Sequence, residues 1–402
     1  MCRKVKIAGI IAEYNPFHNG HKYHIEQTRN NGATHIVAVM GGSFLQRGSA
    51  ACMPKQIRAA AAIACGADIV IELPLPYAMS TAERFAYGGV YLLNSLGCVD
   101  AISFGSESKS LDKLKKAAEA VEDKQILADT KKLLKSGITY AAAREQAVKN
   151  AAGDDIAGIL RSPNNTLAVE YIKQLMRQNS TIMPENIARY AAAHDSIKTS
   201  AEFASASYIR NNAAHNINEL AKYVPPEAMT IYSRAIADGK AFYSDKKTET
   251  AVLAVLRTMT LDDIKSLPDI SEGIENRIYS AVRTSSSLDE ICEKIKTKRY
   301  TLARIRRIIM SAYVGLNGSY GKMPPPYIRV LGFNSKGAEV LNKAKKTASL
   351  NIFTSAAKIA KQGGSCESFI KLEAKATDLY SLGLPKPDVC GSDFTMSVRQ
   401  SI

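Results

Sequence analysis

Four short apolar runs alternate with helical segments near the start of the chain, and this alternation constrains the fold more than any other feature. The runs are rich in β-branched residues, as buried parallel strands are. They cover residues 6–12, 35–42, 67–74 and 100–107. Helical patterns at 21–30 and 55–65 lie between them and end at glycine turns. Because parallel neighbours need crossover connections, the sequence predicts an α/β fold with a doubly wound, Rossmann-like parallel sheet.

Polar residues and glycines stand at the ends of these predicted strands. A histidine cluster follows the first strand, Gly41 and Gly42 close the second, Glu72 lies at the end of the third and Gly105 at the end of the fourth. Ligands of such sheets bind beyond the carboxyl ends of the strands. We therefore expect one binding site at this edge.

The chain is long enough for two domains. Its 402 residues exceed the roughly 250–300 at which a single core stops growing. Beyond residue 110 the pattern becomes mostly helical, and a break at Pro225 and Pro226 interrupts it. We predict a Rossmann-like domain at 1–216 and a mostly α-helical, basic domain at 217–402. The proline-rich stretch at 321–333 predicts a rigid turn followed by a short extended segment.

Composition narrows the function classes. A net charge of +15 and a pI near 9.3 favour a polyanionic partner such as nucleic acid, although excess lysine that only keeps the protein in solution is the alternative. Seven scattered cysteines without a CxxC pair indicate reduced thiols in the cytoplasm. No apolar stretch reaches about 18 residues, so no transmembrane helix and no membrane partner are expected. The run at 6–12 is too short for a signal peptide.

The stretch AEYNPFHNGHKYHI, residues 12–25, holds three of the six histidines. A strand-to-helix turn offers N–H groups and a favourable dipole to an anion, and Gly20 permits close approach of the backbone. His18 and His21 lie three residues apart on one face of the first turn, where they can neutralise charge on a triphosphate under attack. A metal pair completed by His24 is the alternative; we expect phosphate and no metal site.

Longer motifs carry a family resemblance. HNGH resembles the HxGH element of the nucleotidyltransferase superfamily. In chain order, the longer strings are GIIAEYNPFHNGHKYHI, GGSFLQRGSAACMPKQIRAAAAIACGADIVIELP, SFGSE, SPNNTLAVEYIK, FASASYIR and YIRVLGFNSKG. Together they resemble the bacterial tRNA(Met) cytidine acetate ligase family from residue 5 to about residue 340.

This resemblance implies a two-step reaction. Members of the family use ATP, with Mg²⁺, and free acetate to make acetyl-adenylate and pyrophosphate. The acetyl group then passes to N4 of the wobble cytidine of elongator tRNA(Met), without acetyl-CoA. The expected partners are therefore ATP, acetate and elongator tRNA(Met), and the expected location is the cytoplasm.

The resemblance also implies site residues. His18 and His21 are the expected catalytic pair. The expected ATP contacts are Ile11, Ala12, Glu13, Tyr14, Asn15, Pro16, Phe17, His18, Asn19, Gly20, His21, Lys22, Tyr23, His24, Gly105, one of Asn164 and Asn165, and Arg189. SASYIR at 205–210 resembles an element that closes over the triphosphate in relatives, which adds Ser205, Ser207 and Arg210. Helix capping is the competing role for the asparagines and serines, and a surface position is the competing role for Arg189.

Acetate and RNA need further cations. Arg47, Lys55 and Arg58 are candidates for acetate, and equally for tRNA or an ordinary surface position. Glu13 is unexplained, because a carboxylate repels a triphosphate unless it binds Mg²⁺ through water or pairs with a base. For RNA, the stretch at 294–307 combines dense positive charge with Tyr300 as a platform for a loop base, and a solvated basic helix face is its alternative. The charged residues of this patch are Lys294, Lys298, Arg299, Arg306 and Arg307, and Lys336, Lys343, Lys345 and Lys346 extend it.

Two other functions compete with this hypothesis. Another adenylate-forming or nucleotidyl-transferring enzyme with a small-molecule acceptor would share the ATP site but would not need the basic C-terminal half. A non-catalytic tRNA-binding protein would need the charge but not the histidines.

Overall fold

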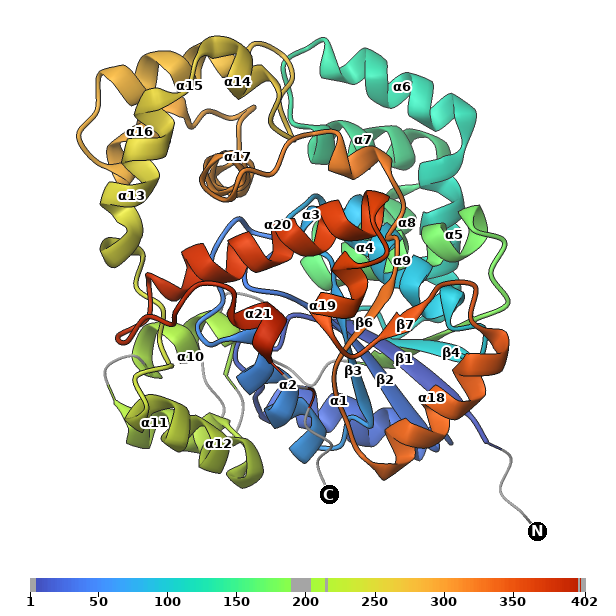
Figure 1. Ribbon diagram of the computed structural model, residues 1–402. Coiled ribbons are helices and arrows are strands. Elements are labelled where there is room, and N and C mark those ends of the chain that lie inside the picture. The colour runs from blue at the N-terminus through green and yellow to red at the C-terminus, as the bar shows by residue number, and fades with distance from the viewer. Residues whose placement is uncertain (1–4, 189–203, 214–215, 397, 399–402) are drawn as a thin grey trace.

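A seven-stranded sheet forms the centre of the computed structural model, which describes residues 5–188, 204–213, 216–396 and 398 (Figure 1). Its strands are β1 (Ile7–Ala12), β2 (His35–Gly41), β3 (Ile69–Leu73), β4 (Ala101–Ser106), β5 (Met183–Ala188), β6 (Ile328–Phe333) and β7 (Ile352–Phe353). Their order is β5-β4-β1-β2-β3-β6-β7. Strands β1 to β5 pair in parallel, and β6 is antiparallel to β3. The predicted α/β class with a parallel, Rossmann-like sheet is confirmed.

Helices account for most of the remaining elements. In the first half they are α1 (Asn19–Asn30), α2 (Lys55–Ala64), α3 (Leu75–Ala78), α4 (Ala82–Ser95), α5 (Leu111–Glu122), α6 (Lys124–Leu134), α7 (Tyr140–Ala152), α8 (Asp154–Ala157), η1 (Gly158–Arg161), α9 (Pro163–Arg177) and α10 (Ala206–Ala213). The second half adds α11 (Ile217–Tyr223), α12 (Pro226–Ala237), α13 (Asp245–Thr258), α14 (Leu261–Lys265), α15 (Ile274–Arg283), α16 (Leu288–Ile295), α17 (Leu302–Val314), η2 (Tyr320–Lys322), α18 (Ser335–Thr347), α19 (Ala356–Ala360), α20 (Gly364–Ser381) and α21 (Ser392–Thr395).

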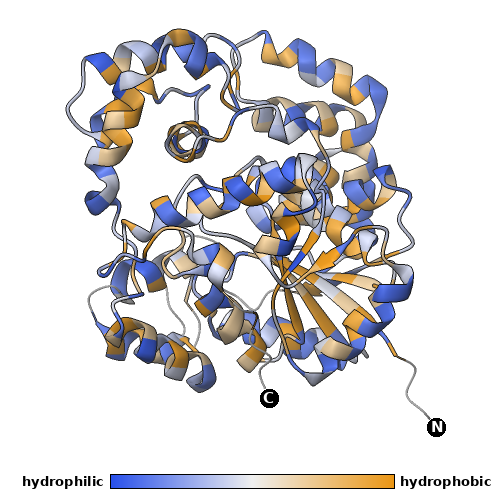
Figure 2. Ribbon diagram, in the orientation of Figure 1, coloured by the Kyte–Doolittle hydropathy of each residue, from blue (hydrophilic) through white to orange (hydrophobic). Residues whose placement is uncertain are grey.

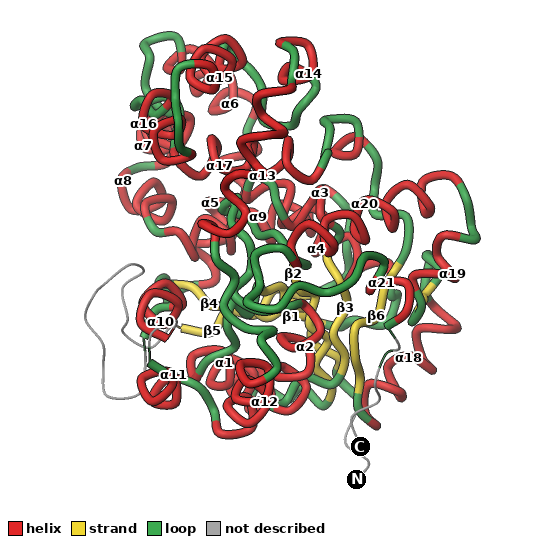
Figure 3. Tube along the Cα trace, turned by 60° about the vertical axis from the view of Figure 1, so that its left-hand side comes forward, coloured by secondary structure: helices red, strands yellow, loops and turns green. Residues whose placement is uncertain are grey.

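The two faces of the sheet have separate cores because side chains alternate along each strand. On one face, residues such as Ile11, Val37 and Ile71 pack against α4 and α9. On the other face, Ile10 and Ala38 pack against α1, α2 and α12. Figure 2 shows the strands almost uniformly apolar, and Figure 3 shows the sheet between these two helical layers.

The C-terminal half shares this sheet. Its strand β6 pairs with β3, with Phe333 opposite Ile69, and the sequence predicted only a short extended segment there. Strand β5 was also missed, because only one apolar side chain of its six residues is buried, at Ile187. The boundary near residue 217 stays a prediction.

A third core holds the helices α13 to α17 together with α20 (Figure 1). From the first half of the chain it also contains Leu75 and Met79 and, in one short segment, Phe44, Leu45, Ala50 and Ala51. That segment, residues 43–51, is a small hairpin closed by a bridge between Phe44 and Ala50. The hairpin 43–51 is therefore a direct connection between the sheet and the helical region.

Among the described residues, no helix combines the length and the apolar character that crossing a membrane requires.

Candidate active site

A cavity of about 560 Å³ opens at the carboxyl end of β1 and β4. Its wall combines the end of β1, the first turn of α1, Gly105 of β4, the start of α9, the tip of the hairpin 43–51 and the start of α10. The predicted site residues on this wall are Ile11, Ala12, Glu13, Tyr14, Asn15, His18, Gly20, His21, Tyr23, His24, Gly105, Asn164, Ser205, Ser207 and Arg210. The fold thus brings residues from 11 to 210 to one edge of the sheet.

His18 and His21 form a stacked pair at the N-terminus of α1. His18 is the N-cap residue, and its Nδ1 accepts a hydrogen bond from the Gly20 N–H at 3.0 Å. The Nδ1 of His21 accepts the N–H of His18 at 3.2 Å, and the two ring centroids lie 3.8 Å apart. Because both Nδ1 atoms are acceptors, a neutral form of either ring carries its proton on Nε2. The two imidazole rings thus have the same tautomer when they are neutral, with the N–H group on Nε2.

Gly20 is required by this arrangement. A Cβ atom at Gly20 would lie 2.9 Å from Cε1 of His18, closer than real Cβ contacts. The glycine therefore lets His18 fold back over the first turn, and it exposes the backbone of that turn to the cavity.

Five of the predicted ATP contacts do not lie on the cavity wall. Phe17 is fully buried and its N–H donates to the Tyr232 hydroxyl at 2.9 Å. Lys22 instead pairs with Glu227 at 2.9 Å, and the Asn19 amide donates to the Lys222 carbonyl at 3.3 Å. The remaining two, Pro16 and Asn165, are buried and do not line the cavity. Helices α11 and α12 thus contact Phe17, Asn19 and Lys22, three residues that the motif alone assigned to ATP.

The two asparagines of SPNN have different places. Asn164 lies on the cavity wall, and its amide donates to Glu107 Oε1 at 2.6 Å. The Asn165 N–H donates to Glu107 Oε2 at 2.9 Å, and its Oδ1 accepts the Ser108 N–H at 2.9 Å. Neither asparagine is the N-cap of α9, because the chain enters that helix at Ser162. Glu107 holds the start of α9 against β4, and its role was not foreseen.

Helix α10 brings a cation to the first strand. Ser205 accepts the Tyr208 N–H at 3.1 Å, as a capping serine does. Arg210 donates to the Asn15 carbonyl at 2.7 Å and to Ser207 Oγ at 3.1 Å, so it lies across the EYNPF turn. Arg189 lies outside the described residues.

The cavity wall also includes residues that the sequence did not single out. Phe104 and Tyr171 lie with ring centroids 5.9 Å apart and give one part of the wall an apolar, aromatic character. Arg161 adds a cation that pairs with Glu145 at 2.7 Å. Phe104 stands inside the SFGSE motif, which was the available signal; nothing local distinguishes Arg161 from a surface arginine.

Lys55 and Arg58 correct an expectation. Neither lines the cavity or the surface, since both are almost completely buried. Arg58 donates to the Met53 carbonyl at 3.0 Å and to the carbonyls of Glu13 and Gly41 at 2.6 and 3.0 Å. It is thus a structural arginine that ties β1 to β2, while Arg47 remains on the cavity wall.

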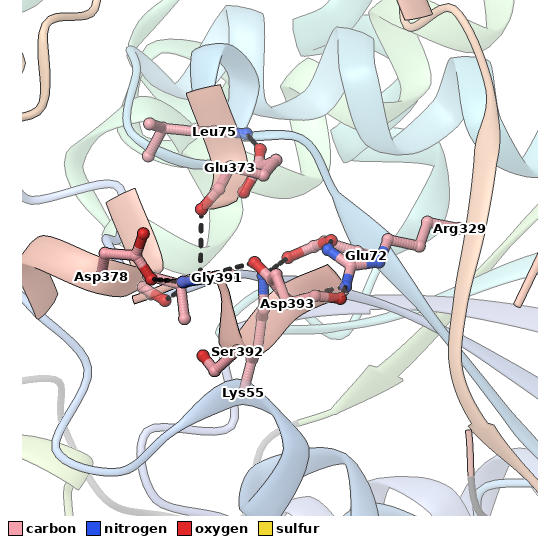
Figure 4. A network of polar contacts seen from close by, with 12 residues as sticks. Lys55, Glu72, Leu75, Arg329, Glu373, Asp378, Gly391, Ser392 and Asp393 are labelled. Carbon is pink, nitrogen blue, oxygen red and sulfur yellow. Dashed lines mark hydrogen bonds and ion pairs between the residues drawn. The ribbon is translucent and has the colours of Figure 1, made fainter. Parts of the chain in front are cut away.

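Lys55 belongs to a buried charge cluster at the end of β3, formed with Glu72, Arg329, Glu373 and Asp393 (Figure 4). Lys55 Nζ lies 2.7 Å from Glu72 and 2.8 Å from Asp393, and Arg329 contacts the same two carboxylates at 2.7 Å each. Burial would raise the pKa of Asp393, but the two cations outweigh it and hold that pKa well below its usual range. Burial and the charge of Glu72 raise the pKa of Glu373 to about 8.

The basic stretch at 294–307 also differs from expectation. Tyr300 is 7 % exposed and donates its hydroxyl to the Glu272 carbonyl, so it is no platform for a base. Arg299 pairs with Glu272 at 2.9 Å and Arg307 with Asp269 at 2.5 Å. The exposed cations here include Lys298 and Arg306.

Comparisons with known proteins find relatives along almost the whole chain. The HIGH Nucleotidyl Transferase family model matches residues 5–392. A tRNA(Met) cytidine acetate ligase of Thermoanaerobacter sp. (strain X514) is 40 % identical over 395 residues, 96 % of this chain and 98 % of that protein. The one of Acetivibrio thermocellus is 37 % identical and covers 98 % of this chain and 99 % of its own. The crystal structure of Thermotoga maritima TmcAL bound with alpha-thio ATP has a TM-score of 0.91 and 30 % identity, covering 98 % of this chain and 99 % of that one.

Proposed function

We propose a reaction for this chain on the premise that it belongs to the tRNA(Met) cytidine acetate ligase family of HIGH nucleotidyl transferases. The chain is an enzyme of that family. It joins acetate to the adenylyl group of ATP, releases pyrophosphate, and passes the acetyl group to N4 of the wobble cytidine of elongator tRNA(Met) in the cytoplasm.

The stacked pair at the start of α1 is the observation that carries this proposal. Both histidines accept a backbone N–H at Nδ1, so the donor of each neutral ring is its Nε2–H group. In our proposal these donors bind the triphosphate and stabilise the charge that grows on the α-phosphate while acetate attacks it. Arg210 and the first turn of α10 hold the phosphates from the other side.

The aromatic part of the wall suits the nucleoside. Phe104 and Tyr171 make part of the wall apolar, and we assign that part to the adenine; we assign Asn164, on the wall at the start of α9, to the base or ribose. Within the part of the chain that the structure describes, no group of three or more histidine, cysteine or acidic side chains forms a metal site. We therefore propose that Mg²⁺ enters with the nucleotide, held chiefly by phosphate oxygens and water.

The acceptor chemistry requires an activated acetyl group. The N4 amine of cytosine is a poor nucleophile, and an acyl-adenylate is a mixed anhydride with AMP as its leaving group. Bases of an anticodon loop are unpaired, so the cytidine can leave its stack to enter the cavity. The net charge of +15 favours a tRNA partner.

Pyrophosphate release from ATP tests the proposal. We expect release that depends on acetate, and labelled acetate that appears in tRNA(Met) once that tRNA is added. Release with unrelated carboxylates, or only with a nucleotide acceptor, would indicate another adenylate-forming enzyme. Binding of tRNA(Met) without any release would indicate a non-catalytic RNA-binding protein.

A further inference from the structure

Glu13 is the one acidic side chain on the cavity wall in the described ranges. The other ionisable groups on that wall are arginines, histidines and tyrosines, among them Arg47, Arg210 and the pair on α1. A carboxylate in this place works against binding of both ATP and acetate, because each of them is an anion. Apart from a bound Mg²⁺, the reactant that a carboxylate here suits is one that is not an anion.

The hairpin 43–51 holds this carboxylate. The Gln46 N–H donates to Glu13 Oε1 at 3.0 Å, and the second oxygen, Oε2, receives no hydrogen bond from any described residue. Gln46 and Arg47 are the central residues of a tight turn in which the Gly48 N–H donates to the Leu45 carbonyl at 2.9 Å. One oxygen of Glu13 is thus held by a backbone N–H, while the other has no hydrogen bond to a described residue.

Helix α17 fixes the hairpin in turn. Gly48 has φ +70°, and a Cβ atom there would lie 2.3 Å from the backbone nitrogen of Arg307. Arg307 donates to the Gln46 carbonyl at 3.4 Å and pairs with Asp269. Phe44 and Leu45 are fully buried in the core of the helical region. The hairpin that the Glu13 side chain contacts is therefore held in place by the helical half of the protein.

We propose that Glu13 is the catalytic base of the second half-reaction, which accepts a proton from N4 of the cytidine as that nitrogen attacks the acetyl-adenylate. This inference rests on the proposed function. An amine is the one reactant of that scheme that must lose a proton, and a positioned carboxylate with one oxygen that has no hydrogen bond to a described residue is suited to receive it.

The bonds and protons balance as follows. The N4 lone pair attacks the acetyl carbonyl carbon, the new N–C bond forms, and the carbonyl electron pair moves onto oxygen. Glu13 Oε2 takes one proton from N4. The intermediate then collapses, the C–O bond to the phosphate breaks, and AMP leaves with that electron pair. Glu13 returns the proton to water, which restores the carboxylate.

The test separates the two half-reactions in the full-length protein. Acetate-dependent exchange of labelled pyrophosphate into ATP, without tRNA, measures formation of the adenylate. Single-turnover transfer of labelled acetyl to tRNA(Met) measures the second step. For Glu13→Gln we expect exchange to stay within about threefold of wild type and transfer to fall about 100-fold or more, the usual contribution of a catalytic base. Glutamine keeps an oxygen for the Gln46 N–H, so the hairpin keeps its contact.

Two further variants make the result decisive. Glu13→Asp keeps a carboxylate on a shorter arm and should transfer faster than Glu13→Gln. Glu339→Gln makes the same chemical change on α18, where Glu339 is exposed and contacts His35, and should change neither step.

Three results would contradict the inference. Exchange that falls as far as transfer would place Glu13 in adenylate formation, for example beside Mg²⁺. Transfer at the wild-type rate in Glu13→Gln would remove any role as a base. A wild-type protein without acetate-dependent exchange would refute the proposed function itself, before any variant is compared.

Discussion

The ends of β1 and β3 lie on the same edge of one sheet, but one borders an open cavity and the other is buried. At the end of β1, histidines, Glu13 and Arg210 surround an open cavity of about 560 Å³. At the end of β3, Glu72 is 2 % exposed and closed in by Lys55, Arg329 and Asp393. Both places carry polar residues after a buried strand, yet only one can admit a ligand.

Distant segments make the difference. Arg329 arrives on β6, and Asp393 and Glu373 arrive on the last two helices, more than 250 residues after β3 along the chain. These elements seal the end of β3 and attach the C-terminal half to the sheet. Among the residues that the structure describes, no comparable segment covers the end of β1, where α1 and α10 present their N-terminal turns to the cavity. Polar residues at a strand end are therefore a site only where no later segment neutralises them.

A substitution in the buried charge cluster at the end of β3 should have the largest effect, and this effect should be on the stability of the fold. Arg329→Met leaves Glu72 and Asp393 buried with Lys55 alone. Removing one partner of a buried ion pair costs about 3–5 kcal/mol, so the free energy of unfolding in urea should fall by that amount. ATP affinity of the folded fraction should stay within about threefold, because no cavity residue is touched. Arg299→Met, which breaks an exposed pair with Glu272, should cost less than about 1 kcal/mol; an equal loss would remove the contrast.

A substitution at the open end, beside the cavity, should instead reduce the rate of adenylate formation. His21→Ala removes one Nε2–H donor, and adenylate formation should fall about 100- to 1,000-fold, as when an oxyanion donor is lost. Acetate-dependent pyrophosphate exchange measures this fall. Binding of tRNA(Met) should remain near wild type. If tRNA binding fell equally, the stacked pair would be structural or would face the RNA.

The pH dependence of stability further distinguishes the buried cluster at the end of β3 from the open cavity at the end of β1. Two cations face three carboxyl groups at the end of β3, and Glu373, with a pKa of about 8, keeps a proton that the unfolded chain loses near pH 4.5. The native state then binds one more proton, so this group makes stability fall as pH rises, by about 1.4 kcal/mol per unit up to pH 8. Urea unfolding of Glu373→Gln should lack this component. An unchanged slope between pH 5 and 8 would show that Glu373 is ionised in the fold.

The smallest effect is expected at Lys22, which stands between the histidines but pairs with Glu227 on α12. Its exposed ion pair is worth about 0.2–1 kcal/mol, and Lys22→Ala should change the KM for ATP less than about twofold. A tenfold rise in the KM for ATP would show that Lys22 contacts the nucleotide, as the motif alone suggested.

Local pattern was sufficient for the part of the fold that builds the cavity. The four apolar runs are the strands β1 to β4, and the predicted helices at 21–30 and 55–65 are α1 and α2. Strand ends of parallel neighbours must meet, so His18 and Gly105 could be placed on one edge before any contact was known, while Asn164 was assigned to the site by the family resemblance alone. Whether these residues contact ATP stays a prediction.

Long-range pairing was not predictable in the same way. Lys55 looks like a surface lysine until Asp393 is folded onto it, and Tyr300 looks like a base platform until Glu272 takes its hydroxyl. The antiparallel strand β6 has no partner nearby in the sequence, and the hairpin 43–51 belongs to a core assembled more than 200 residues later. Such contacts depend on the whole fold and leave no periodic signal.

Hydrogen–deuterium exchange with and without ATP tests most directly whether the nucleotide binds at the end of β1 and not at the end of β3. Peptides that cover residues 13–24 and 105–108 should exchange their amide hydrogens more slowly when ATP is added, because the bound nucleotide would cover the backbone of these segments. Peptides that cover 68–75 and 327–333 should be unchanged. Protection at β3 and β6 without protection at the start of α1 would contradict the assignment of the site.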